Sequence, residues 1–235
     1  MLLWIMAGFF FWLALRELRA GLFGRTGYAG RAAIDLPYIG LMLALGTVFA
    51  YPALERARLE HILLQKARIL AGTNKVSVHC NTLFDSFLDR NVFAAGHANE
   101  ATGAIVFQHP WCSRLIDYLH HPASANRDEL ISFAIFVHES MHIRGEWHDE
   151  ARTECQAIQR LYRAGTLLGV PAAVAKRNGR AYYRDIYQQR ATQGWMSAGY
   201  YSPECAPGKA LDEHLPDATW NDDSTATPAT DAPAR

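Results

Sequence analysis

Three residues near the middle of the chain have the types and the spacing of a metal-dependent hydrolase site. His138, Glu139 and His142 follow the pattern H-E-x-x-H. In a helix, histidines four residues apart lie on one face, so both imidazoles can bind one zinc ion. Glu139 lies about 100° around the helix, where it can contact a water beside the metal. Zinc lowers the pKa of such a water and the glutamate can take its proton, so the pattern predicts zinc-dependent hydrolysis.

The residues around the motif favour a helix in the interior of a soluble domain over a chance match. Residues 131–137 are uniformly apolar or small, which predicts burial of that side of the helix. Two histidines and a glutamate on a buried helix need compensation, and a metal ion supplies it. The helix is expected over residues 126–144. Arg127, Asp128 and Glu129 form its first turn, and these charges exclude a location within a bilayer.

Two residues after the motif are candidates for the third protein ligand. Glu150 and Glu154 lie four residues apart in a second expected helix, over 149–164, and therefore share a face. His148 is the alternative, because it completes the longer pattern H-E-x-x-H-x-x-G-x-x-H. We favour Glu150, because an amphipathic helix follows His148 at once and Gly145 is explained as the end of the first helix.

Over residues 130–158 the chain resembles the gluzincin metallopeptidases, a branch of the zincins. In gluzincins the first acid of an E-x-x-x-D/E element binds zinc, and the second orients a histidine ligand through its free ring nitrogen. The resemblance implies that Glu150 is the ligand and that Glu154 orients His138. If His148 were the ligand, the chain would instead resemble the metzincins, and Met196 would have to form their methionine-containing turn.

The resemblance also implies a place for a peptide substrate. Zincins bind an extended peptide along an edge strand by β-augmentation, and residues 104–108 are the candidate strand. The Glu154-Cys155 pair and the Pro-Glu-Cys-x-Pro-Gly turn at 203–208 further resemble a group of small membrane-anchored bacterial proteins. The first functional hypothesis is therefore a membrane-anchored zinc peptidase that acts on a peptide or protein substrate.

The second hypothesis is a non-catalytic membrane protein in which a structural zinc ion joins the two helices. Structural zinc normally has four protein ligands, and the two histidines of the motif, Glu150 and His148 could supply four. Glu139 is not a ligand in either arrangement. Its presence favours the enzyme.

Two uncharged runs at the start of the chain predict a membrane anchor over residues 1–54. Residues 1–15 and 36–54 contain no charged side chain, and as helices they would be about 22 Å and about 28 Å long. We expect two transmembrane helices in the lipid bilayer. The segment between the runs is rich in arginine, which favours a cytoplasmic loop and places the rest of the chain outside. These arginines are Arg16, Arg19, Arg25 and Arg31.

The four cysteines support the same side of the membrane. They form an even set without a C-x-x-C pattern, and all follow the anchor. We expect two disulfides, Cys80–Cys112 around a β hairpin and Cys155–Cys205 between the helix of Glu150 and the 203–208 turn. Disulfides persist outside the cytoplasm, so the domain is expected to be extracytoplasmic.

Composition limits the remaining possibilities. The chain has 23 Lys and Arg against 23 Asp and Glu, and half of its residues are hydrophobic. The lack of basic excess argues against nucleic acid as a partner, and the hydrophobic content excludes a fully disordered chain.

The expected fold is α+β, mainly helical with a small hairpin or sheet. Strands are predicted at 76–79, 91–95 and 104–108. A connecting helix over 55–75 precedes a zincin-like domain over 76–210, and residues 211–235 are expected to be disordered. A third helix is predicted from Pro171 to about Gln193, and its tyrosines are expected to pack rather than to act in catalysis: Tyr182, Tyr183 and Tyr187.

Overall fold

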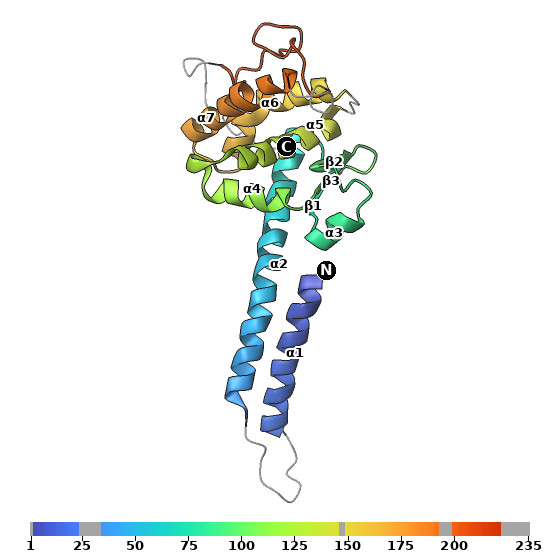
Figure 1. Cartoon of the computed structure of the whole chain (residues 1–235), viewed down its shortest axis with the longest axis vertical. Helices are drawn as coiled ribbons and strands as arrows, with labels where there is room; N and C mark the ends of the chain where they lie inside the picture. Colours follow the sequence, from blue (N-terminus) through green and yellow to red (C-terminus); the bar gives the residue numbers. More distant parts are fainter. Residues whose placement is uncertain (1, 24–33, 146–148, 193–198, 222–235) are drawn as a thin grey trace, which may run out of the picture. The chain divides into compact units, whose positions relative to one another are not determined.

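The computed structural model describes residues 2–23, 34–145, 149–192 and 199–221, shown in Figure 1. It is mostly helical with one three-stranded sheet, which confirms the α+β class. The chain divides into two compact units, residues 1–59 and 60–235. Each unit is described by itself below.

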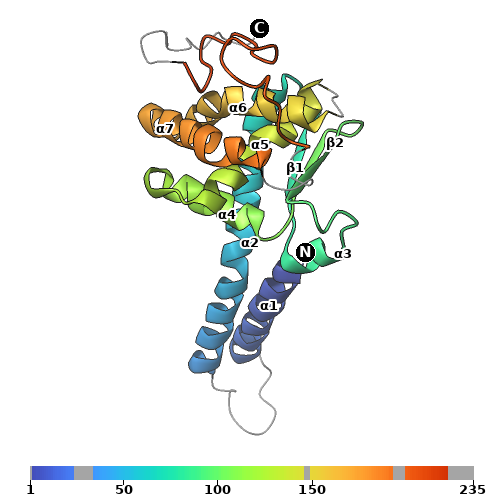
Figure 2. The same ribbon diagram turned by 45° about the horizontal axis from the view of Figure 1, so that its top comes forward.

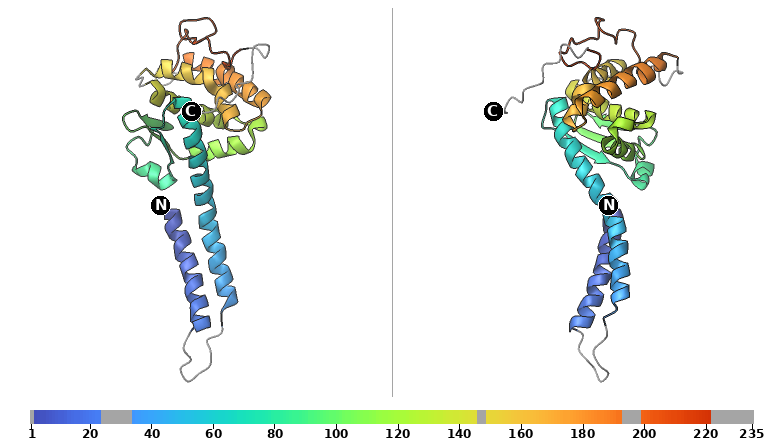
Figure 3. Two further views of the ribbon diagram at one scale, coloured as in Figure 1. Left: turned by 180° about the vertical axis from the view of Figure 1, so that it is seen from behind. Right: turned by 90° about the vertical axis from the view of Figure 1, so that its left-hand side faces the viewer.

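The first unit contains two helices that lie side by side (Figure 3). α1 runs over Leu2–Phe23, and α2 begins at Leu36 and continues into the second unit as far as Ala71. The ring of Phe10 stacks on that of Phe49, with 5.6 Å between centroids. A Cβ on Gly46 would lie 2.6 Å from the ring of Phe11, so this glycine permits the close approach of the helices.

Among the described helices, only α2 is long and apolar enough to cross a membrane. α1 has 22 residues, but any eighteen consecutive residues of it include Arg16, Glu17 and Arg19. The part of α1 before Arg16 is about 21 Å long at the helical rise, whereas the hydrocarbon core of a bilayer is about 30 Å thick. The prediction of two transmembrane helices is therefore corrected to one candidate span.

The second unit carries the strands and the remaining helices. Its helices are α3 (Leu83–Leu88), α4 (Trp111–His120), α5 (Arg127–Gly145), α6 (Glu150–Leu167) and α7 (Ala172–Tyr182). The shorter helical segments are η1 (Pro122–Ser124), η2 (Tyr183–Tyr187) and η3 (Gln188–Ala191). The sheet contains β1 (Ser77–Cys80), β2 (Gly96–Asn99) and β3 (Ala104–Phe107).

The order of the strands differs from the prediction. β3 lies in the centre, parallel to β1 and antiparallel to β2. The predicted edge strand at 104–108 is thus the central strand, because it pairs on both sides, and β2 forms the edge instead. Residues 91–95 are not a strand, since the Asp89 carboxylate accepts a hydrogen bond from the backbone of Asn91 and turns the chain there.

The hairpin between β2 and β3 turns over the four residues 100–103. The Asn99 side chain accepts a hydrogen bond from the backbone of Thr102. Gly103 follows with a φ of +75°, and a Cβ there would lie 1.8 Å from the carbonyl oxygen of Lys75. Only glycine fits this position, which sets where β3 begins.

The helical hairpin of α5 and α6 forms the centre of the second unit. α5 packs against α6, α4 and β2, and Figure 2 shows it between the sheet and α6. Its start is capped reciprocally by Asn126 and Glu129, and the Asp149 side chain accepts hydrogen bonds from the first backbone N–H groups of α6. Both helices thus occupy the predicted ranges to within a few residues. Phe136 and Val137, before the motif, are fully buried.

Both predicted disulfides are confirmed. Cys80 and Cys112 are bonded with their Cα atoms 5.7 Å apart, and Cys155 and Cys205 with theirs 5.5 Å apart. The first bond joins the end of β1 to the start of α4. The second joins α6 to the segment that follows the site.

The predicted disorder from residue 211 is wrong for residues 211–221. This segment has turns instead of regular structure, but it packs along α6 through polar contacts. Asp217 forms a bidentate ion pair with Arg163, and Glu213 forms an ion pair with Arg160 through a single contact. Thr219 is buried and donates its backbone N–H to the carbonyl of Gln159. Residues 222–235 lie outside the described chain.

Candidate functional site

The two histidines of the motif and Glu150 converge at the centre of the α5–α6 hairpin. His138 Nε2 lies 3.0 Å from His142 Nε2 and 3.0 Å from Glu150 Oε2. The distance from His142 Nε2 to Glu150 Oε2 is 3.3 Å. Three ligand atoms this close, two of them on buried histidines, could hold a metal ion. The structure therefore brings together the three residues that the sequence singled out as one ligand set.

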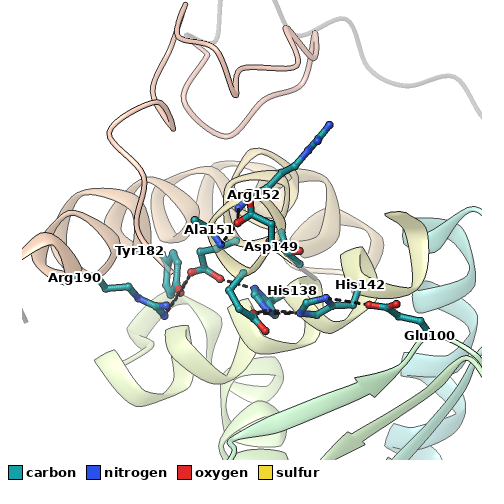
Figure 4. Close-up of polar contacts among 11 residues, drawn as sticks. Glu100, His138, His142, Asp149, Ala151, Arg152, Tyr182 and Arg190 are labelled. Atoms are coloured by element: carbon teal, nitrogen blue, oxygen red, sulfur yellow. Dashed lines mark hydrogen bonds and ion pairs between the residues drawn. The ribbon is translucent and has the colours of Figure 1, made fainter. Parts of the chain in front are cut away.

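A row of polar contacts extends from this cluster in both directions (Figure 4). His138 Nδ1 lies 2.8 Å from Glu154 Oε2. The other oxygen of Glu154 accepts a hydrogen bond of 2.5 Å from the Tyr182 hydroxyl, which in turn accepts one from Arg190. On the opposite side, His142 Nδ1 lies 3.8 Å from Glu100 Oε1. Each histidine thus presents Nε2 to the cluster and Nδ1 to a carboxylate.

Glu139 lies beside the ligand set and does not belong to it. It is buried and lines a cavity of about 380 Å³ together with His138. The edge strand approaches it closely, because a Cβ on Gly96 would lie 3.4 Å from Glu139 Oε1 and 2.9 Å from Ile135 Cγ2. The rest of the cavity wall is mainly apolar or aromatic, with two arginines and one further glutamate: Phe93, Ala94, Ala95, Trp111, Arg127, Ile131, Glu154, Tyr182, Ile186, Arg190 and Tyr200.

The electrostatics of the cluster favour a positive charge between the ligands. Burial alone would lower the pKa of His138, but the carboxylates of Glu150 and Glu154 outweigh it and raise that pKa to about 10. Burial likewise opposes ionisation of Glu150, and the hydrogen bonds from both histidines lower its pKa to about 2. The cluster therefore stabilises a bound cation, which can be a proton or a metal ion.

Burial raises the pKa of Glu139, and the nearby histidines only partly offset this. A carboxylate with a raised pKa holds a proton more strongly than usual, which suits it to take one from a nearby water. Tyr200, which also lines the cavity, is a second group whose protonation affects what the site can do. Burial and the carboxylates of the site raise its pKa to about 12, so its hydroxyl stays protonated and can donate a hydrogen bond.

Tyr200 reaches the site on a segment that two tyrosines of η2 hold in place. Its ring lies 5.6 Å from that of His138, and the guanidinium of Arg190 lies over it. The Tyr187 hydroxyl is hydrogen-bonded to the backbone of Ser202, and the Tyr183 hydroxyl donates to the carbonyl of Cys205. The expectation that these tyrosines pack is confirmed, and their packing brings Tyr200 to the ligand set.

Two residues of the alternative ligand arrangement, His148 and Met196, lie outside the described residues. Four contributors to the site were not anticipated from the sequence: Gly96, Glu100, Arg190 and Tyr200. No spacing relative to the motif points to them, because they come from the sheet and from segments that follow α7.

The chain matches no family model, none of the curated proteins and none of the solved structures. The function must therefore be argued from the geometry of the site.

Proposed function

We propose that the chain is a zinc-dependent peptidase, anchored to a membrane by α2, with its site outside the cytoplasm. The observation that carries the proposal is the convergence of His138, His142 and Glu150 beside a cavity that also holds Glu139. A set of ligands and a separate buried carboxylate are the two parts that metal-assisted hydrolysis requires.

The donor set fits zinc in type and in spacing. Two imidazole nitrogens and one carboxylate oxygen are common zinc ligands. At zinc–ligand distances of about 2.0–2.1 Å, tetrahedral neighbours lie about 3.3 Å apart. The donor atoms here are 3.0–3.3 Å apart, so a zinc ion fits with small adjustments. When bound, zinc would polarise a substrate carbonyl and acidify a water at the open position.

The side chains of the site then have separate tasks. Glu139 takes the proton of the attacking water and delivers it to the leaving amine. Glu154 fixes the ring of His138 so that Nε2 faces the metal, and Tyr182 and Arg190 hold Glu154. The apolar walls of the cavity exclude water and strengthen these polar interactions.

The sheet supports a peptide as the substrate. β2 forms an edge of the sheet, and Gly96 of this strand lies against Glu139. An extended peptide that paired with β2 would run past the ligand set and could place a carbonyl there. The sequence predicted that residues 104–108 bind the peptide. We assign peptide binding to β2 instead, because β3 is paired on both sides.

The competing hypothesis is a structural zinc site. Such sites are normally closed by four protein ligands, whereas the described residues offer three ligand atoms and an adjoining cavity. The fourth ligand of the structural hypothesis, His148, lies outside the described residues, so it is the cavity and the buried Glu139 beside the ligand set that favour catalytic zinc.

The disulfides and the arginines that precede α2 support a location of the domain outside the cytoplasm. Two disulfide bonds are typical of an oxidising compartment. To test this, free thiols are blocked during lysis, and non-reduced peptides from the membranes are then mapped. The map should show two bridged peptide pairs and no blocked cysteine. Four blocked cysteines would place the domain in the cytoplasm.

The catalytic proposal is tested with Glu139→Gln in the full chain. The variant should retain one zinc per chain by elemental analysis, because no ligand is changed. Its cleavage of a peptide library should fall at least ~100-fold, because the general base is lost. Asp117→Asn, at an exposed position on α4, is the matched control and should behave as the wild type. A wild-type protein that cleaves no peptide, or equal cleavage by the Gln variant, would overturn the proposal.

A further inference from the structure

The second unit gathers its exposed large apolar side chains in one short segment. Among the described residues of this unit, every exposed large apolar side chain except Ile62 and Ile69 in α2 lies between residues 83 and 93. They are Leu83, Phe84, Phe87, Leu88, Val92 and Phe93, and we call them the α3 patch. Phe87 is 78% exposed and Phe93 fully exposed. A concentration of this kind on a soluble surface marks an interaction site.

The opposite face of α3 is polar and holds the helix to the domain. Thr82 and Asp85 form a capping box at its start, and the Ser86 hydroxyl accepts a hydrogen bond from the backbone of His109. Asp89 accepts hydrogen bonds from the side chains of Asn81 and Gln108. These contacts hold the polar face of α3 against the domain, so its apolar face points outward. The exposure of the patch is therefore not a sign that the helix is poorly packed.

Connectivity selects the occupant of this face. The acids nearest the patch, Asp85 in α3 and Asp89 directly after it, are held by the hydrogen bonds of the inner face. The segment is also close along the chain to the candidate span. Glu60 lies six residues, or about 9 Å of helix, after Leu54, and it accepts a hydrogen bond from the backbone of Cys80.

We propose that the α3 patch docks into the interfacial region of a lipid bilayer. The inference rests on the proposed anchoring by α2. Protruding Phe and Leu side chains are suited to the boundary between headgroups and acyl chains, which needs no complementary groove. Phe93 also lines the cavity of Glu139, so the docked surface adjoins the site. Peptide segments at the bilayer surface are the substrate class that this arrangement favours.

The docking is tested on the full chain in vesicles of phosphatidylcholine and phosphatidylglycerol. All four native cysteines are in disulfides, so Phe87→Cys introduces a single site for a nitroxide label. Arg184→Cys, at an exposed position of η2, is the matched control. The label at 87 should collide often with oxygen and rarely with a water-soluble nickel complex, and the label at 184 should collide freely with nickel. Phe84→Cys repeats the measurement on the same face.

The other outcomes overturn the proposal. Free access of both reagents to position 87 means that the patch faces water. Exclusion of both means that protein covers it, either a partner or a second copy. Vesicles that do not carry the protein on flotation would remove the anchor and the docking together. None of these readings depends on zinc or on hydrolysis, so they are distinct from failure of the peptidase.

The substrate class has its own measurement. Phe84→Ser with Phe87→Ser should lower cleavage of a lipid-linked peptide in vesicles severalfold and leave cleavage of the same peptide in solution unchanged. Equal cleavage of the lipid-linked peptide by the variant and the wild type would exclude this substrate class. Loss of cleavage in solution as well would show damage to the cavity and would also contradict it.

Discussion

The carboxylate of Glu154 lies 2.8 Å from Nδ1 of His138 and leaves the other ring nitrogen to face Glu150 and His142. This contact sets the tautomer of His138, because a ring nitrogen that donates to a carboxylate carries the proton. Nε2 is then the nitrogen that binds a metal ion, once the metal displaces the proton that Glu150 stabilises there. Glu154 itself is buried and bound by Tyr182, so its position is well defined.

Replacement of Glu154 by Gln should weaken zinc binding about 10- to 100-fold, the usual effect of losing such a partner. The amide keeps the size of the side chain but not its charge. Competition with a chelating dye measures the affinity, and Asp117→Asn again serves as the control. Unchanged affinity in Glu154→Gln would show that the contact does not orient a ligand.

The identity of the third ligand can be decided by a pair of variants. Glu150→Ala should lose far more zinc than His148→Ala, because Glu150 Oε2 lies within 3.3 Å of both histidine nitrogens. Elemental analysis after dialysis gives the two contents. The reverse order would favour the metzincin-like arrangement, in which His148 completes the set.

Gly96 should be required for activity and dispensable for metal binding. In Gly96→Ala the new methyl group would lie 2.9 Å from Ile135 Cγ2 and would displace it, next to Glu139, the proposed general base. We expect peptide cleavage to fall about tenfold or more, since small misplacements at a site are costly, with full zinc content.

Ile135→Ala supplies the control for this change. In the double variant the smaller side chain makes room for the methyl group, so part of the lost activity should return. A double variant no better than Gly96→Ala would mean that the collision is not the cause. Loss of zinc in Gly96→Ala would place its effect on the ligands instead.

We expect the stability of the fold to depend on pH through His79, which lies away from the candidate site. Its hydrogen bond with Glu60 raises the pKa of His79 above 6.5, against the opposing effect of partial burial, and Asp85 adds to the rise. Because the pKa of His79 is higher in the folded state, protonation of this histidine stabilises the fold. The contribution is complete when the pH is below the unfolded pKa of about 6.5. That contribution is lost as pH rises through the folded value. It is small, because 60% of the His79 side chain is exposed.

Histidine-selective NMR measures the pKa of His79 directly. In Glu60→Gln the pKa should move down towards 6.5, while the amide oxygen still accepts from the backbone of Cys80. A wild-type value at or below 6.5, or no change in the variant, would contradict the pairing.

The parts of the fold that could be predicted are those with strong local signals. The helices of His138 and Glu150 have capping residues at their starts, and both were placed to within a few residues. The two disulfides followed from an even set of cysteines. These features depend on residues close in sequence or on a small number of possible pairings.

The parts that could not be predicted depend on contacts between distant segments. β2 is displaced because Asp89 turns the chain before it and Gly103 after it, and neither effect is visible as an alternation of polar and apolar residues. Residues 211–221 lack periodicity, yet ion pairs with α6 hold them. Tyr200 reaches His138 through the packing of Tyr183 and Tyr187 on residues beyond it.

The bond between Cys155 and Cys205 has a consequence for when the site becomes complete. Tyr200 precedes Cys205 by five residues, and Glu154 directly precedes Cys155, so one covalent bond joins the two segments on either side of His138. Before oxidation, no covalent bond holds the segment that carries Tyr200 against α6, which carries Glu150 and Glu154, and only noncovalent contacts do so. With the proposed location outside the cytoplasm, a newly made chain would complete its site only after residue 205 had crossed the membrane and the two thiols had been oxidised. Maturation and export would then be linked, and the domain would acquire its final form only at its destination.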